Sequence, residues 1–139
     1  MITEPKVREL LAQPVLARLA GSDANGQPHV VPVWFLWDGE FVWISAFSST
    51  RKVKILSDNP RVAVLIEPDA DHPSPLQAVL LKGEVEIIES PPEFVARQAI
   101  AIYTRYLGEE GVLAVEPQSW ARDPENRLLR IRPKKVYSW

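Results

Sequence analysis

Residues 23–37 read Asp-Ala-Asn-Gly-Gln-Pro-His-Val-Val-Pro-Val-Trp-Phe-Leu-Trp. The Asn25-Gly26 pair favours the positive φ angles of a hairpin turn, and a predicted strand at 15–20 precedes it. The segment from His29 to Trp37 is rich in β-branched and aromatic residues, which favour strands. The stretch therefore predicts an antiparallel hairpin. Because Pro32 cannot donate to a β-ladder, we expect an edge, a bulge or the approach of another group there.

Further strand signals follow this hairpin along the chain. Asp38-Gly39 predicts a second turn that leads into a strand at 41–45, so the first three strands should form an antiparallel meander. Later strands are predicted at residues 61–67, 77–89 and 128–136. A glycine at position 83 suits the bend of a barrel strand.

Three helices are predicted around these strands. An amphipathic helix at 4–12 should cover one end of a barrel, and a short helix begins at Ser49 or Thr50 and stops before Pro60. A third runs from Pro91 to about residue 107, and residues 108–126 are polar and interrupted by glycine and proline. Six strands with inserted helices predict a mainly β fold, a small antiparallel barrel, because closing a sheet removes its exposed edges.

Length, charge and composition exclude several classes of protein. The 139 residues fit one domain, residues 1–139. The absence of cysteine excludes disulfides, thiol nucleophiles, iron–sulfur clusters and thiolate zinc sites. A net charge of −2 gives no general attraction to nucleic acid or to an anionic membrane. With no leader pattern and no apolar run near the roughly 20 residues of a membrane helix, we expect a cytoplasmic protein.

Residues 48–56, Ser-Ser-Thr-Arg-Lys-Val-Lys-Ile-Leu, carry the clearest chemical signal. Three cations lie in or near the first turn of a predicted helix, where the helix dipole disfavours positive charge. Free backbone N–H groups, hydroxyl groups and the charges of Arg51 and Lys52 together suit a phosphate group. The alternative is a solvated basic helix face balanced by neighbouring carboxylates, and the residues alone leave both interpretations open.

The order of these segments resembles the pyridoxamine 5'-phosphate oxidase-like superfamily. The hairpin at 25–35, the Asp-Gly turn, the Thr-Arg-Lys sequence at 50–52 and Asn-Pro-Arg-Val at 59–62 match its pattern over residues 15–90. The resemblance implies a split β-barrel. It also implies a cofactor, FMN or in a related branch the deazaflavin coenzyme F-420, bound at the interface of a homodimer.

The resemblance also implies which residues bind the cofactor. Arg51 and Lys52 would hold its phosphate, with Thr50 adding a hydroxyl group, while the strand at 31–34 and the pair at 44–45 would line the ring. A glutamine would reach across the dimer. The expected cofactor-binding residues are Val31, Pro32, Val33, Trp34, Ile44, Ser45, Thr50, Arg51, Lys52 and Gln77.

Two departures from the family pattern affect the expected activity. The FMN-binding pattern has an arginine where Val31 stands. This difference keeps the deazaflavin coenzyme F-420 as an alternative cofactor. The ending at 131–139 lacks the substrate-binding tail of true pyridoxamine phosphate oxidases, so oxidation of vitamin B6 is not expected. The expectation is an FMN- or F-420-dependent oxidoreductase that transfers hydride to or from an unidentified small molecule.

The aromatic and histidine residues allow alternative roles. Trp34 would stack on a flavin or pack in the core, and five tryptophans in 139 residues favour a subunit interface. His29 and His72 have no partner at metal-ligand spacing, so no metal site is predicted. His29 is a candidate heme ligand, which keeps a non-catalytic flavin or heme carrier as the alternative function. Binding of single-stranded nucleic acid by strand aromatics is disfavoured by the net acidity.

Overall fold

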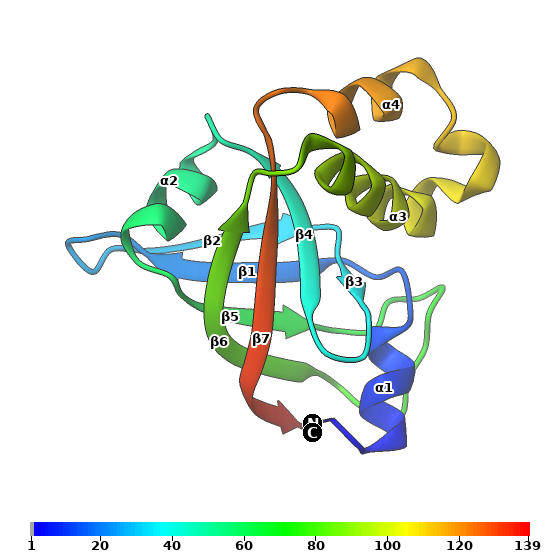
Figure 1. The fold of residues 1–139 in the computed structure, drawn as a ribbon. Helices are drawn as coiled ribbons and strands as arrows, with labels where there is room; N and C mark the ends of the chain where they lie inside the picture. The colour runs from blue at the N-terminus through cyan, green and yellow to red at the C-terminus, as the bar shows by residue number, and fades with distance from the viewer. Residues whose placement is uncertain (1) are drawn as a thin grey trace.

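The computed structural model describes residues 2–139 as one curled antiparallel sheet with helices at its ends (Figure 1). The sheet has seven strands in the order β2-β1-β5-β6-β7-β4-β3. The mainly β prediction is confirmed, although six strands were expected. The elements are α1 (Pro5–Leu11), β1 (Ala17–Ser22), β2 (Pro28–Val33), β3 (Leu36–Trp37), β4 (Val42–Phe47), α2 (Arg51–Asp58), β5 (Arg61–Ile66), β6 (Val79–Ile88), α3 (Pro92–Gly111), α4 (Val115–Arg122) and β7 (Asn126–Ser138).

The predicted hairpin is confirmed as β1 and β2. Gly26 has a φ angle of 82°, and Asp23 Oδ1 accepts hydrogen bonds from the Asn25 and Gln27 N–H groups at 2.9 Å each. β2 ends the sheet on one side, so the ladder tolerates Pro32 because one of its sides is unpaired.

The predicted strand at 29–37 is wrong in one respect, because it breaks between β2 and β3. The peptide groups of Phe35 do not continue the ladder. The Phe35 N–H donates to the Tyr106 hydroxyl at 3.0 Å, and its carbonyl accepts from Arg105. The chain bends there, and β3 pairs with β4 instead, which accounts for the seventh strand.

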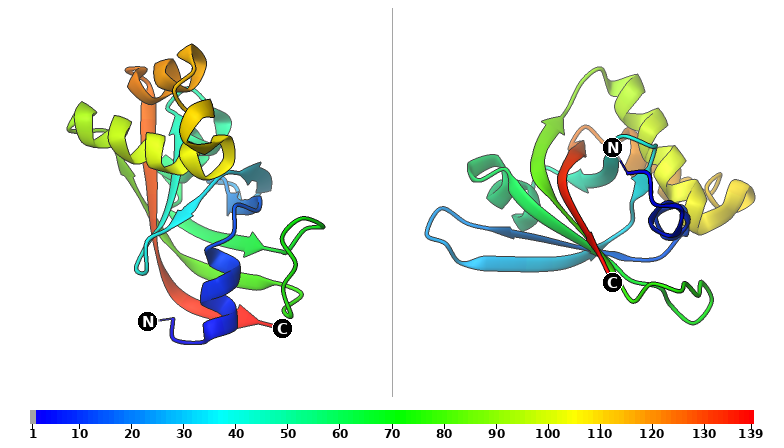
Figure 2. Two further views of the ribbon diagram at one scale, coloured as in Figure 1. Left: turned by 90° about the vertical axis from the view of Figure 1, so that its right-hand side faces the viewer. Right: turned by 90° about the horizontal axis from the view of Figure 1, so that it is seen from below.

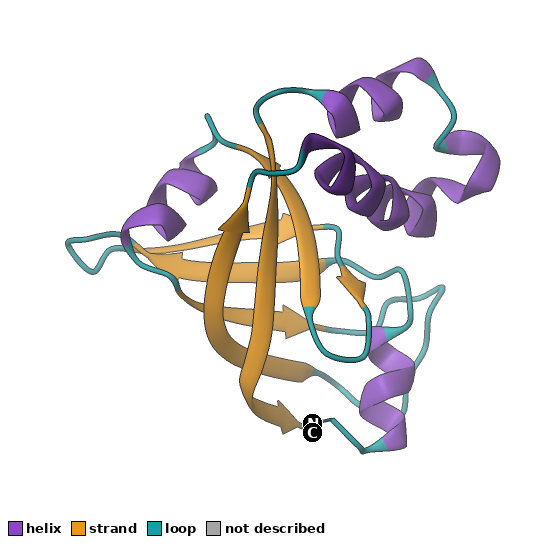
Figure 3. Cartoon of the chain, viewed as in Figure 1, coloured by secondary structure: helices purple, strands orange, loops and turns teal. Residues whose placement is uncertain are grey.

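The predicted meander is confirmed at its second turn, where β3 and β4 pair in antiparallel fashion, but it is interrupted at the bend, so β2 and β4 are not neighbours in the sheet. β4 pairs with β7, and β1 pairs with β5, in antiparallel registers. α1 lies at one end of the half-barrel, whereas α3 and α4 lie at the other end, beside β4 and β7 (Figures 2 and 3). The fold therefore has two apolar clusters, one inside the curled sheet with α1 and α2 and one beneath α3 and α4.

The helix predictions are confirmed for α1, α2 and α3, and α4 was missed. α4 lies inside the polar stretch at 108–126 and buries only Pro117 and Ala121. Such a short, mostly exposed helix gives almost no hydrophobic period for a sequence reading. Gly108, with a φ angle of 80°, bends α3 before its last turn. Within residues 2–139, no helix is long and apolar enough to cross a membrane.

Gly83 lies where the register between β6 and β7 shifts, and a Cβ atom there would collide with the carbonyl oxygen of Arg132. We expect Gly83→Ala to lower the free energy of unfolding by about 1–3 kcal/mol, because the backbone of β7 must move to admit the methyl group. Chemical denaturation measures this, with exposed Lys82→Ala as the control in the same strand. Equal stability of the two variants would contradict the close approach.

Candidate functional site

The start of α2 is an uncapped helix terminus with positive charge. Thr50 occupies the cap position, but its hydroxyl donates to the Phe47 carbonyl at 2.7 Å, and no side chain caps the helix. The first turn contains no acidic residue. In the part of the chain described, neither Arg51 nor Lys52 takes part in a side-chain ion pair. These N–H groups and cations are free to bind an anion.

A small pocket lies between this helix and the β1–β2 hairpin. Its volume is about 90 Å³, which suits a compact group such as a phosphate. We call it the cationic pocket because His29, Arg51 and Lys52 lie on its wall. Its other lining residues are Leu19, Gly21, Val30, Val31, Ile55 and Leu56.

A second, larger pocket lies on the other side of Lys52, between β4 and the helices α3 and α4. Its volume is about 330 Å³, and we call it the aromatic pocket. Trp34 stacks on Tyr106 with ring centroids 4.9 Å apart and meets Tyr103 edge to face at 6.1 Å. The residues that line the pocket are Trp34, Ser45, Ala46, Phe47, Thr50, Lys52, Tyr103 and Trp120.

The two pockets adjoin because Lys52 lines both. Val31 and Arg51 belong to the cationic pocket, and Trp34, Ser45 and Thr50 belong to the aromatic pocket. The structure thus brings six of the ten expected cofactor-binding residues to two pockets that share Lys52.

The other four expected residues lie elsewhere. Val33 and Ile44 are buried in the core inside the sheet, and Pro32 is exposed on the edge strand. Gln77 is also exposed, and its N–H donates to the Trp139 carbonyl at 2.7 Å. None of these four lines either pocket.

A directed hydrogen-bond chain supports the wall of the aromatic pocket. Buried Asn126 donates through Nδ2 to the Ala121 carbonyl at 3.1 Å, so its Oδ1 faces Ser45 and accepts from the Ser45 hydroxyl at 2.6 Å. With that proton committed, the Tyr103 hydroxyl is the donor in its 2.9 Å contact with Ser45. Burial raises the pKa of Tyr103, which keeps it neutral and leaves its oxygen lone pairs for a ligand.

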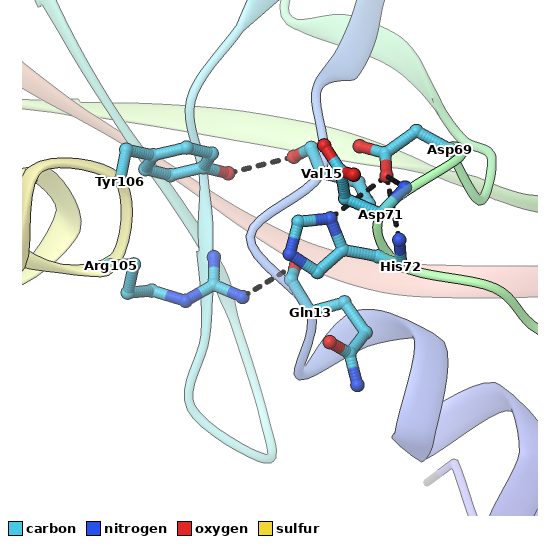
Figure 4. Close-up of polar contacts among 7 residues, drawn as sticks. All are labelled: Gln13, Val15, Asp69, Asp71, His72, Arg105 and Tyr106. Atoms are coloured by element: carbon cyan, nitrogen blue, oxygen red, sulfur yellow. Dashed lines mark hydrogen bonds and ion pairs between the residues drawn. The ribbon is translucent and has the colours of Figure 1, made fainter.

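Arg105 and Tyr106 of α3 fix the backbone beside the aromatic pocket. Figure 4 shows both side chains directed at the segment between α1 and β1. Arg105 donates to the carbonyls of Leu11, Gln13 and Phe35. The Tyr106 hydroxyl donates to the Val15 carbonyl at 2.8 Å. We call these contacts of Arg105 and Tyr106 the backbone clamp. The clamp holds the bend at Phe35, which places Trp34 beside the pocket.

The Asp69–His72 pair in the same view belongs to a turn (Figure 4). Asp69 Oδ1 accepts from the N–H groups of Asp71 and His72 and lies 2.8 Å from His72 Nδ1. Asp69 and His72 therefore stabilise a turn. Across residues 2–139 no group of acidic residues and histidines has the arrangement of a metal site.

Comparison with known proteins places this geometry in a family. The model of the family described as pyridoxamine 5'-phosphate oxidase matches residues 3–139. The chain belongs to this family. The match extends the resemblance beyond residues 15–90 to nearly the whole length. A comparison with curated proteins gave no match.

Solved structures agree with membership of the pyridoxamine 5'-phosphate oxidase family. An F-420 reductase is 26% identical, with a TM-score of 0.77 and 98% of each chain covered. A conserved hypothetical protein from Mycobacterium tuberculosis is 25% identical, with a TM-score of 0.77 over 100% of this chain and 85% of that one. The heme storage protein HutZ from Vibrio cholerae shares the fold, at 20% identity and a TM-score of 0.74 over 99% and 94% of the chains.

Three lining residues, His29, Tyr103 and Trp120, were not among the expected cofactor-binding residues. His29 carried a usable signal, because it lies two positions before Val31 in β2, and residues two apart on a strand face the same side. Tyr103 and Trp120 come from α3 and α4, far along the chain, and no local pattern indicates that they meet Trp34.

Proposed function

We propose that this protein is a cytoplasmic oxidoreductase that uses FMN or coenzyme F-420 to transfer hydride to or from a small molecule. The observation that carries the proposal is the junction of the cationic and aromatic pockets at Lys52. A flavin-type cofactor has the same two parts, a phosphate and a planar aromatic ring. The ring supplies the hydride chemistry, whereas the protein binds and orients it.

The residues divide the binding between them. Arg51, Lys52 and the free N–H groups of α2 hold the phosphate through charge-assisted hydrogen bonds. Trp34 and Ser45 border the ring, and the lone pairs of Tyr103 accept a hydrogen bond from an N–H or O–H group of the bound molecule. No side chain is required as an acid or a base.

Two observations bear on which cofactor is used. Valine at position 31 removes a cation that the FMN-type pattern has, and an F-420 reductase is among the similar structures. The test is titration of cofactor-free protein with FMN and with coenzyme F-420, followed by fluorescence. Tight binding of one of them identifies the cofactor. The bound cofactor is then reduced, and an electron acceptor is added; recovery of the oxidised spectrum supports turnover. Binding of neither would overturn the proposal.

We also propose that the protein is a homodimer, with the redox site shared between subunits. Exposed aromatic side chains at the end of the chain support this, since Trp139 is 55% exposed and Tyr137 44%, and aromatic residues are enriched at protein interfaces. Gln77 lies beside Trp139 and away from its own subunit's pockets. We expect sedimentation at micromolar concentration as a dimer. A monomer would count against a shared site.

The second candidate is a carrier that binds flavin or heme without turnover. Its support is the buried His29 Nε2 atom, which has no hydrogen-bond partner among residues 2–139, together with the shared fold of HutZ. Against heme, the pocket that His29 lines has a volume of about 90 Å³, well below the roughly 300–1,000 Å³ of ligand pockets. A Soret band that appears with hemin and disappears in His29→Gln would favour this candidate.

A further inference from the structure

Three hydroxyl groups on the wall of the aromatic pocket have their protons committed to acceptors within the protein. They belong to Ser45 of β4, Thr50 of the loop after β4, and Tyr103 of α3. The Thr50 hydroxyl donates to the Phe47 carbonyl at 2.7 Å. A hydroxyl group has one proton and two lone pairs, so an oxygen whose proton is already used can only accept a hydrogen bond from a ligand.

A backbone carbonyl fixes the direction of the contact between Ser45 and Tyr103. The Ala121 carbonyl can only accept, so it holds the Nδ2 atom of Asn126 toward it at 3.1 Å. The reversed amide would place Oδ1 against that carbonyl oxygen. Asn126 is 2% exposed, and its Oδ1 atom takes the Ser45 proton at 2.6 Å. The Tyr103 hydroxyl must therefore donate to Ser45 across 2.9 Å.

The hydroxyl side of the pocket consequently presents lone pairs. Burial raises the pKa of Tyr103, so its proton stays in the contact with Ser45 at neutral pH. The side-chain donors that remain on the described wall are Lys52 Nζ and the indole N–H groups of Trp34 and Trp120. None of these three groups belongs to the hydrogen-bond chain that starts at Ala121.

We infer that the aromatic pocket selects a planar ligand that presents an N–H or O–H group to Tyr103 over one that presents only an acceptor. That such a ligand is the substrate of the redox site rests on the proposed function. An acceptor placed against the Tyr103 oxygen would give up its hydrogen bonds with water and gain none there, whereas a donor would regain one. Asn126 is the positioning residue of this preference, because it acts on the ligand through Ser45 and Tyr103.

The experiment uses indole and quinoline as probes. Both are flat bicyclic aromatic molecules, but indole carries an N–H donor, whereas quinoline carries a nitrogen lone pair. Dissociation constants are measured by NMR titration of the full chain at mildly basic pH, where quinoline is uncharged. The proteins are the native chain, Tyr103→Phe, Ser45→Ala and Ser57→Ala, and their backbone amide spectra also show whether each variant is folded.

Ser57→Ala is the matched control for Ser45→Ala. It removes a hydroxyl group that donates to the Val53 carbonyl within α2, and Ser57 lines neither pocket. Tyr103→Phe gives the ratio of the two affinities for a wall without a hydroxyl group at this position, which corrects for the different sizes of the probes.

Relative to Tyr103→Phe, we expect the native protein and Ser57→Ala to favour indole over quinoline by about 5- to 10-fold, the effect of one hydrogen bond between neutral groups. Ser45→Ala leaves the Tyr103 proton without its acceptor, so this hydroxyl can turn and donate to quinoline. The preference for indole should therefore fall by about 5-fold or more in Ser45→Ala.

Equal ratios in the native protein and in Tyr103→Phe would overturn the inference, as would binding of neither probe, and both results are independent of Ser45→Ala. An unchanged preference for indole in folded Ser45→Ala would show that Ser45 does not hold the proton. Titration with FMN and coenzyme F-420 is a separate measurement. If neither cofactor binds while the probes are discriminated as expected, the proposed function fails and the donor preference of the pocket stands.

Discussion

Arg105→Met is expected to lower the free energy of unfolding by about 2–4 kcal/mol, because three backbone carbonyls lose a charged donor. The loss is smaller than the free energy of three charge-assisted hydrogen bonds, since the methionine variant also avoids the cost of burying a cation. Within the described residues 2–139, Arg105 has no carboxylate partner, and its hydrogen bonds go to the carbonyls of Leu11, Gln13 and Phe35. Burial lowers the pKa of its guanidinium, although an arginine in a protein keeps its charge. The midpoint of chemical denaturation measures the change.

The matched control is Arg97→Met on the same helix. Arg97 is exposed and rests over the Phe94 ring with its guanidinium carbon 5.9 Å from the centroid, so its replacement should change stability by less than about 0.5 kcal/mol. The Arg105 variant should also loosen the aromatic pocket, because the clamp holds the bend beside Trp34. Equal stability of the two variants would show that the carbonyls find water and that Arg105 is not a clamp.

The double variant Arg51→Ala with Lys52→Ala should weaken cofactor binding by several kcal/mol, an affinity loss of roughly 10²- to 10⁴-fold. Each charge-assisted contact to a phosphate contributes about 1.5–3 kcal/mol, and each 1.4 kcal/mol is about tenfold. Fluorescence titration with FMN and coenzyme F-420 measures the loss. Folding should be nearly unaffected, because Arg51 is exposed and neither cation has an ion-pair partner among the described residues.

The control for charge is Lys54→Ala with Lys135→Ala. Both lysines are exposed, neither lines the two pockets, and the change in net charge is the same. The control should bind the cofactor nearly as tightly as the native protein. Undiminished affinity in the Arg51/Lys52 variant would mean that this segment is only a solvated basic helix face.

The local features of this fold were readable from the sequence because each depends on neighbouring residues. Asn25-Gly26 specifies the hairpin, since few other pairs accept its backbone angles. Pro60 ends the short helix, and glycine at position 83 marks a close approach of two strands. The segment at 50–52 identified the charged helix start, because cations at that end of a helix are unfavourable without an anion.

Strand pairing beyond the two predicted turns was not readable. β4 and β7 are separated by more than 75 residues, yet they are neighbours in the sheet, and nothing in the strand at 41–45 specifies that partner. Alternating burial fixes which face of a strand is covered, but not which strand covers its edge. For that reason the sequence did not show that β7 is the second neighbour of β4.

The sequence by itself therefore determined the mainly β class, the hairpin, the family and the cationic start of α2. Only the tertiary structure decided that the strand at 29–37 breaks at Phe35, because Arg105 and Tyr106 take its peptide groups from a distant helix. It also decided that His29 joins Arg51 and that Tyr103 joins Trp34. The physical reason is that hydrogen bonds and pockets form between atoms close in space, whereas sequence patterns record only closeness along the chain.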